Sequence, residues 1–308
     1  MTALSSSKRT GDSSNAPRRA THGASGGAPT GSATATKTIR IVLLALVGLL
    51  MIVPVYLLIT NAFKSQHDII AQPFGWPSDG FSLEYLQRAI ASPEFNVVGA
   101  YAITIFFVVA VNVLCLLVVG PAAYVIARGT RKYHRVVMLV LLAGLFIPGQ
   151  TLVIPVIYVL KAVGLVGTMP GFLLFETTLT VPTTMFLFVA FVQSVPRELD
   201  EAAKIDGASR YGTFWRVIFP IMTPVVATAV ILNSVSVWSD FVNPQFILGP
   251  SSGIYTVTTG IYAAISKLST DFTLVYPNML LAAAPVIVFY ILLQKRIIGG
   301  LTSGAIKG

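Results

Sequence analysis

The amino-acid sequence predicts an all-α membrane protein with six transmembrane helices and a long polar loop between the fourth and the fifth. Of its 308 residues, 55% are hydrophobic and only 11% are charged, and the mean hydropathy is +0.78. Soluble domains carry about 25% charged residues, so this composition is typical of a chain that lies in lipid. Six runs are long and apolar enough to cross a hydrocarbon core of about 30 Å, which takes about 20 residues per helix.

The six predicted spans follow one another between residues 41 and 294. They are Ile41–Thr60, Gly99–Tyr124, Val136–Leu160, Phe172–Val195, Ile221–Phe241 and Phe272–Gln294. Each is expected to be a helix, because lipid offers no hydrogen-bond partner to open backbone groups. None of the runs alternates between apolar and polar residues as the strands of a membrane barrel do. Pro148 and Gly149 halve the third span and are expected to kink it.

Two loops on the outer side are expected to carry short helices. The stretch 241–266 has no charged residue, but Pro and Gly interrupt it, and its intact part, 254–266, is too short to cross. We interpret it as an outer loop with a short helix at the membrane interface. In the loop 63–98, residues 83–91 predict an amphipathic helix. Two interpretations of this loop are about equally good: a contact surface for a partner protein, or a plain solvated loop.

Lysine and arginine are biased to one side of the predicted membrane. Of the 21 Lys and Arg residues, all but Lys64, Arg88, Lys161 and Lys267 lie in the two chain ends, the connection between spans two and three, or the polar loop. Such residues favour the cytoplasmic side, so we expect a multi-pass protein of the cell membrane with both termini in the cytoplasm. The net charge of +9 is therefore a topology signal. Nucleic-acid binding would need the basic residues on one folded face.

The two ends of the chain differ in composition from the spans. Residues 1–39 predict a disordered cytoplasmic tail, because a Ser-, Gly-, Ala- and Thr-rich segment buries too little surface to offset its ordering entropy. Residues 40–298 form the transmembrane domain, and 299–308 form a short cytoplasmic C-terminal tail. The first span is too long for a cleaved signal peptide and lacks a small-x-small cleavage pattern.

The charge-dense loop 196–220 is the most informative segment. Its acids are Glu198, Asp200, Glu201 and Asp206, and its bases are Arg197, Lys204, Arg210 and Arg216. Pro196 suits the first turn of a helix, Gly207 can take the left-handed conformation that ends one, and a second helix is expected from about Ser209. An amphipathic turn on the lipid headgroups is one interpretation. A lever joined to spans four and five is the other.

Within this loop, Glu-Ala-Ala is followed by three residues and Gly, with Ile-x-Pro further on. This order resembles the cytoplasmic coupling loop of permease subunits of ATP-binding-cassette importers. Further motifs resemble the maltose-type second permease subunit of the carbohydrate-importer branch, from about Arg40 onward. They are Asn-Ala-Phe-Lys at 61–64, Phe-Ile-Pro-Gly at 146–149, Trp-Ser-Asp-Phe at 238–241 and the Gly-rich end 299–308. The third departs from the usual Trp-Asn-Asp-Phe, because Ser239 stands in the Asn position.

The resemblance implies partners and contact residues. An ATPase subunit would contact Glu201, Ala202, Ala203, Asp206, Gly207 and Ala208. The C-terminal tail would enter the interface between two ATPases through Gly300, Leu301, Thr302, Gly304 and Lys307. A frayed chain end is the alternative for that tail. The other implied partners are a second permease subunit, an extracytoplasmic solute-binding protein and a sugar or oligosaccharide substrate.

Polar residues inside the spans are candidates for a substrate path, because burying them in lipid costs free energy. The candidates are Gln150, Asn233, Trp238 and Asp240. Asp240 and Glu176 are expected within a turn or two of the outer surface, at the interface. For the deeper amides, hydrogen bonds between helices, worth about 0.6 kcal/mol each, are an adequate account. Trp238 can stack on a sugar ring or anchor the chain at the interface.

Motifs for nucleotide, metal and catalytic chemistry are missing from the sequence. Without Gly-x-x-x-x-Gly-Lys-Ser/Thr, ATP hydrolysis is expected in a separate chain, and we expect no cofactor and no enzyme activity. His22, His67 and His134 are scattered and Cys115 is the single cysteine, so no metal site is expected. The competing hypothesis is a secondary carrier driven by protons or sodium. The sequence lacks the internal repeats and midplane ionisable residues common in such carriers.

Overall fold

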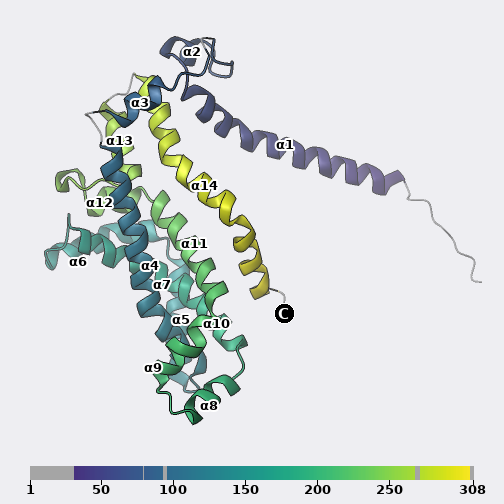
Figure 1. The fold of residues 1–308 in the computed structure, drawn as a ribbon, viewed down its shortest axis with the longest axis vertical. Coiled ribbons are helices and arrows are strands. Elements are labelled where there is room, and N and C mark those ends of the chain that lie inside the picture. Colours follow the sequence, from purple (N-terminus) through teal and green to yellow (C-terminus); the bar gives the residue numbers. More distant parts are fainter. Residues whose placement is uncertain (1–30, 79, 93–95, 268–270, 306–308) are drawn as a thin grey trace, which may run out of the picture. The chain divides into compact units, whose positions relative to one another are not determined.

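A computed structural model of the chain describes residues 31–78, 80–92, 96–267 and 271–305 (Figure 1). The chain divides into two units, residues 1–53 and 54–308. Helix α1 (Gly31–Asn61) provides all of the first unit that is described. It begins at Gly31, so residues 31–39 are helical, contrary to the predicted tail. Adding residues to an existing helix needs no new nucleus, which favours this extension. Residues 1–30 of the predicted tail lie outside the described part.

All regular elements of the described part of the second unit are helical. They are α2 (Gln66–Ala71), α3 (Glu84–Ile90), α4 (Val97–Arg128), α5 (Lys132–Ala143), η1 (Gly144–Phe146), η2 (Gly149–Leu152), α6 (Val153–Ala162), α7 (Met169–Ser194), α8 (Glu198–Ile205), α9 (Arg210–Thr213), the π-helical turn η3 (Phe214–Ile218), α10 (Phe219–Ile221), α11 (Thr223–Ser239), α12 (Val242–Ile247), η4 (Pro250–Ser252), α13 (Val257–Lys267) and α14 (Phe272–Ala305). Helix α3 confirms the short helix predicted over 83–91.

The predicted all-helical fold is confirmed, with four straight candidate spans and two bent helix pairs that bring the number to six if each pair is one span. Thr36–Asn61, α4, α7 and Phe272–Leu292 are each long and apolar enough to cross a membrane. The other two spans are helix pairs, 132–162 with a bend of 96° and 210–239 with a bend of 79°. The fifth span therefore enters through a sharp turn before α11.

The third span is not the kinked single helix that the sequence predicted. Helix α5 covers 12 residues, which rise about 18 Å, well short of the hydrocarbon core. Ile147 (φ −91°, ψ 115°) and Pro148 (φ −59°, ψ 121°) are both extended and separate η1 from η2. A residue before proline is driven out of the helical region by the proline ring, so the interruption begins at Ile147.

The C-terminal segment is also more helical than predicted. Helix α14 continues through Gly299 and Gly300 and ends at Ala305, so residues 299–305 do not form a separate extended tail. Glycine weakens a helix interior by about 1 kcal/mol relative to alanine but does not by itself end it. Lys307 lies outside the described residues.

Helices α4 and α7 form the centre of the second unit. Cys115, Val119, Phe188 and Val192 are fully buried between them. In Figure 1, α3 and α13 lie at one end of α4, and α8 and α9 lie at the other. Helix α13, expected at the membrane interface, packs on α4 and α14 through buried residues such as Val257.

Candidate functional site

The loop 196–220 folds as a short helix that ends in a sharp turn. Helix α8 starts at Glu198 and carries three acids in its first turn, where the positive end of the helix dipole stabilises them. At its end, Gly207 adopts a φ of +81°, in the left-handed region that the sequence analysis predicted. The amide of Ala208 donates to the carbonyl of Ala203 at 2.9 Å, which closes the last turn.

The second helix of the loop is divided into three short pieces. The Ser209 hydroxyl accepts a hydrogen bond from the Gly212 amide and caps α9. A π-helical turn and α10 follow without a break. Phe214 is buried in the central core, and its ring contacts Trp215 at a centroid distance of 4.8 Å. The loop is therefore anchored in the helix bundle on the side that leads to span five.

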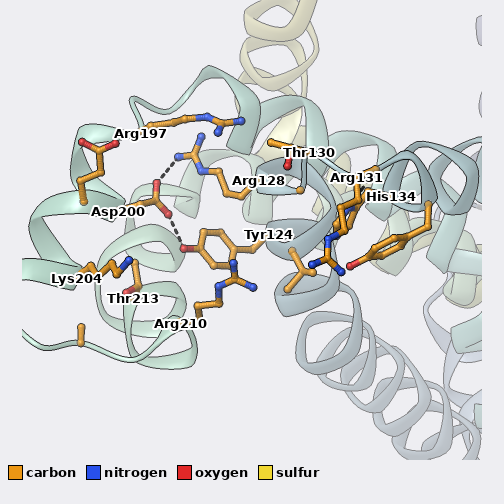
Figure 2. A pocket seen from close by; sticks show the side chains of 15 residues that line it. Tyr124, Arg128, Thr130, Arg131, His134, Arg197, Asp200, Lys204, Arg210 and Thr213 are labelled. Carbon is orange, nitrogen blue, oxygen red and sulfur yellow. Dashed lines mark hydrogen bonds and ion pairs between the residues drawn. The ribbon is translucent and has the colours of Figure 1, made fainter.

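Helix α8 is tied to the C-terminal end of α4 by three side chains, which we call the α4–α8 junction (Tyr124, Arg128 and Asp200). The Tyr124 hydroxyl donates to Oδ1 of Asp200 at 2.5 Å, and Nη2 of Arg128 lies 2.8 Å from Oδ2 of Asp200. Figure 2 shows both side chains pointing at this carboxylate. Arg128 also donates to the carbonyl of Val195 at 3.0 Å. One arginine thus joins α4, the end of span four and α8.

A cavity of about 740 Å³ lies beside this junction (Figure 2). Its lining includes four further basic residues, Arg131, Arg197, Lys204 and Arg210. They come from the connection after α4 and from the loop 196–220, two segments that the charge bias assigned to the same side of the membrane. The structure brings these two segments together.

The two faces of α8 differ sharply. Of the predicted ATPase-contact residues, Glu201, Ala202, Asp206 and Gly207 are exposed, and Ala208 is half-buried. Ala203 differs from these residues, because its side chain is 7% exposed and faces its own chain. The sequence analysis missed Ile205, which is 86% exposed. An apolar residue between Lys204 and Asp206 was the signal that could have identified it.

Three of the four candidate substrate-path residues line one cavity. Gln150, Asn233 and Asp240 border a cavity of about 600 Å³ between α7, α11 and the break in span three, which we call the acidic cavity. Trp238 does not line it. Its indole Nε1 donates to the carbonyl of Ala282 at 3.2 Å, on the side of α11 that faces α14. Two positions along a helix correspond to a rotation of about 200°, so Trp238 and Asp240, the residue that caps α11, point in different directions.

The acidic cavity also contains polar residues that the sequence analysis missed or placed elsewhere. Glu176 was expected at the interface but is 2% exposed and lines this cavity. Its Oε2 accepts a hydrogen bond from Nδ2 of Asn243 at 3.3 Å. Asn243 was not considered, because it follows the fifth span in a stretch interpreted as an outer loop. Only its packing beside Glu176, 67 residues earlier, marks it as part of the site.

Deeper in the bundle, amides join neighbouring helices as the sequence analysis expected. Nδ2 of Asn112 donates to the Ser234 hydroxyl at 3.1 Å and links α4 to α11. Nδ2 of Asn233 donates to the Thr184 hydroxyl at 3.3 Å and links α11 to α7. Asn233 therefore serves both the packing of the bundle and the wall of the acidic cavity.

Residues 119–297, which include the loop 196–220 and the acidic cavity, match the family described as binding-protein-dependent transport system inner membrane component. The chain belongs to this family. Its members are transport components and not enzymes, so the chain is a membrane-embedded subunit of a binding-protein-dependent transport system.

Relatives of this inner membrane component cover nearly the whole chain. It is 32% identical to the multiple sugar-binding transport system permease protein MsmG of Streptococcus mutans (87% of this chain, 96% of that protein). It is also 32% identical to the melibiose/raffinose/stachyose import permease protein MelC of Bacillus subtilis (90% and 99%). The diacetylchitobiose uptake system permease protein NgcG of Streptomyces coelicolor is 30% identical (86% and 87%).

A solved structure shares the fold of this inner membrane component. It is the crystal structure of a bacterial ABC transporter involved in the import of the acidic polysaccharide alginate. The TM-score is 0.71 at 21% identity, over 86% of this chain and 97% of that one. These comparisons give no support to the hypothesis of a secondary carrier.

Proposed function

We propose that this chain is the permease subunit of an ATP-driven importer for a sugar or oligosaccharide that an extracytoplasmic binding protein delivers. It would pair with a second permease subunit and with separate ATPase subunits in the cell membrane. The family supports the dependence on a binding protein, and three relatives at 30–32% identity carry sugar-import names.

The observation that carries this proposal is the two-sided character of α8. Its inner side is fixed to α4 through Asp200 and to the bundle through Ala203. Its outer side presents Ile205, which is 86% exposed among the described residues. An exposed isoleucine ringed by charges is well suited to insert into a groove on a partner protein. We assign that groove to the ATPase, with Glu201, Ala202, Asp206 and Gly207 around Ile205.

The proposed mechanism is alternating access. Closure of the ATPases on ATP would move α8, and the α4–α8 junction would transmit this displacement to α4 while the aromatic anchor at Phe214 transmits it to α11. The spans would reorient and open a path between the two permease subunits toward the loaded binding protein. After ATP hydrolysis they would return to the starting arrangement. Charge bias supports a cytoplasmic position for α8 and both termini. The end of α14, over residues 300–304, remains a proposed second ATPase contact.

The acidic cavity is the proposed section of the substrate path in this subunit. Polar side chains such as Gln150 and Asn233 are costly to expose to lipid, so we expect the second permease subunit to cover the open side of this cavity. The two subunits would then enclose a polar route between them.

Cysteine cross-linking tests the contact at α8. In a Cys115→Ala background, Ile205→Cys is expected to capture the ATPase chain in membranes that still import sugar. Ile70→Cys is the matched control, because it is 64% exposed on α2, near the opposite end of α4. Capture at residue 70, or none at residue 205 in active membranes, would contradict the assignment.

Charge substitution at the same position tests the consequence for transport. Ile205→Asp is expected to lower ATP-driven import by about a hundredfold, because a carboxylate in an apolar groove costs several kcal/mol. The melting temperature of the permease is expected to stay the same, since Ile205 is 86% exposed. Import is measured in proteoliposomes with the ATPases and the binding protein, using melibiose, N,N′-diacetylchitobiose and maltotriose. Gradient-driven uptake by the chain alone would refute the proposed function.

A further inference from the structure

The acidic cavity has a charge pattern that restricts what it can hold. Of its described lining residues, Glu176 and Asp240 carry carboxyl groups, and none is Lys, Arg or His. Both carboxyl groups accept a hydrogen bond from Asn243, so they lie close together on one wall of the cavity. A ligand that brings another negative charge would therefore meet repulsion without a compensating cation.

Asn243 holds the two acids together and is itself incompletely satisfied. Its side-chain Nδ2 donates to Glu176, and its backbone amide donates to Oδ1 of Asp240 at 3.3 Å. The residue is 7% exposed, and its Oδ1 has no hydrogen-bond partner among the described residues. Leaving a buried polar atom unpartnered costs free energy. A ligand in the cavity that donates a hydrogen bond to this oxygen would recover that cost.

The remaining wall offers both acceptors and apolar surface. Gln150 supplies a side-chain amide, and the Thr180 hydroxyl is already committed to the carbonyl of Thr177 at 2.7 Å. Leu179 and Phe241 add apolar area on the same wall. Acceptors thus dominate the polar atoms, and the best partner is a molecule rich in hydroxyl donors with apolar C–H faces.

We propose that the acidic cavity binds an uncharged, hydroxyl-rich saccharide during import and rejects saccharides that carry a carboxylate or phosphate. Asp240, Glu176 and Asn243 are the residues that set this preference. The inference rests on the proposed function, because it names the chemical class of the sugar that the path accepts. Discrimination in this subunit adds a second selection step to any choice that the binding protein makes.

The test measures direct binding of sugar to the intact transporter without its binding protein. The probe is whichever of melibiose, N,N′-diacetylchitobiose and maltotriose the reconstituted wild-type complex imports, together with the aldonic acid made by oxidising its reducing end. Equilibrium dialysis against the complex trapped with ATP and vanadate gives the two dissociation constants. We expect the neutral sugar to bind at least about tenfold more tightly than its acid, because the negative charge of this carboxyl pair repels a further carboxylate.

Variants of the cavity then locate the preference. The isosteric double variant Glu176→Gln/Asp240→Asn removes both ionisable groups and is expected to reduce the preference to about threefold or less. Asn243→Ala is expected to raise the dissociation constant of the neutral sugar about tenfold, because the variant loses one hydrogen bond in a buried site. Glu84→Gln, an exposed acid on α3, is the matched control and should change neither constant. If the double variant does not assemble, Asp240→Asn alone carries the same comparison.

The outcomes separate this inference from the proposed function. Import of none of the three sugars would count against the sugar class of the proposed function. Import of a sugar whose acid binds equally well to the wild type would overturn only the inference, as would a preference unchanged in the double variant.

Discussion

The α4–α8 junction and the acidic cavity both hold carboxyl groups inside the helix bundle, but they surround these groups with different partners. In the α4–α8 junction, Asp200 has a cation 2.8 Å from one oxygen and a phenol on the other. In the acidic cavity, Glu176 and Asp240 share the amide groups of a single Asn243 and have no cation on the lining. An ion-paired carboxylate is held in one geometry, whereas carboxyl groups without a cation leave room for a ligand. The first region therefore suits force transmission and the second suits solute binding.

Of the substitutions that test this comparison, those at the α4–α8 junction are expected to lower import most. Arg128→Gln and Asp200→Asn are each expected to lower the initial rate of import about tenfold, because either leaves the other side chain without its charged partner. The two side chains are only 14% and 18% exposed, so water does not replace the lost partner well. Import and ATP hydrolysis are measured together in proteoliposomes, where loss of import with retained hydrolysis indicates uncoupling.

A double-mutant cycle decides whether the two residues act as a unit. The double variant should lose no more import than either single variant, which corresponds to a coupling free energy of about 1–3 kcal/mol. Arg131→Gln is the matched control, since Arg131 lines the same cavity but has no ion pair within the described residues. Additive losses of import for Arg128→Gln and Asp200→Asn, or a similar loss for Arg131→Gln, would contradict the role of the junction. They would show that import depends on the total charge of this region.

A smaller effect tests how tightly the core beside the junction and the wall of the acidic cavity are packed. A Cβ added to Gly120 on α4 would lie 3.0 Å from Cζ of Phe214, whereas one added to Gly149 beside the acidic cavity would lie 3.4 Å from Leu179, an ordinary contact. Gly120→Val is therefore expected to lower the free energy of unfolding by about 1–3 kcal/mol, and Gly149→Val by less. Thermal melting of the purified permease measures both. Equal losses would mean that the two regions are packed alike.

Local sequence signals predicted much of the fold. Apolar run lengths located the six spans, and Gly207 was identified as the left-handed end of α8 because few other residues adopt that conformation. Proline at residue 148 predicted an interruption. Its size, a 96° turn instead of a kink, was not predictable, because it depends on how α5 and α6 pack on the rest of the bundle.

The site was predictable only where one helix determines it. The loop motif led to α8, but which face of α8 is exposed depends on Asp200 meeting Arg128, a residue 72 positions earlier in another span. For that reason Ala203 was assigned to the outer face and Ile205 was overlooked. Glu176 and Asn243 are likewise brought together only by the packing of α7 against α12. Contacts between distant segments leave no periodic signal in the sequence.

The smallest predicted effect concerns Trp238, which is next to Ser239 in the sequence but, unlike Ser239, does not line the acidic cavity. Its ring packs edge-on against Tyr101 at 5.7 Å, and its Nε1 donates to the carbonyl of Ala282. Trp238→Phe keeps an aromatic ring but removes that hydrogen bond, so the permease should lose about 0.6 kcal/mol of stability. Import of a neutral sugar should stay within about twofold of the wild type, because no wall of the acidic cavity changes. A tenfold loss of import with an unaltered melting temperature would instead place the sugar on the α14 side of α11. The assignment of the substrate path to the acidic cavity would then be wrong.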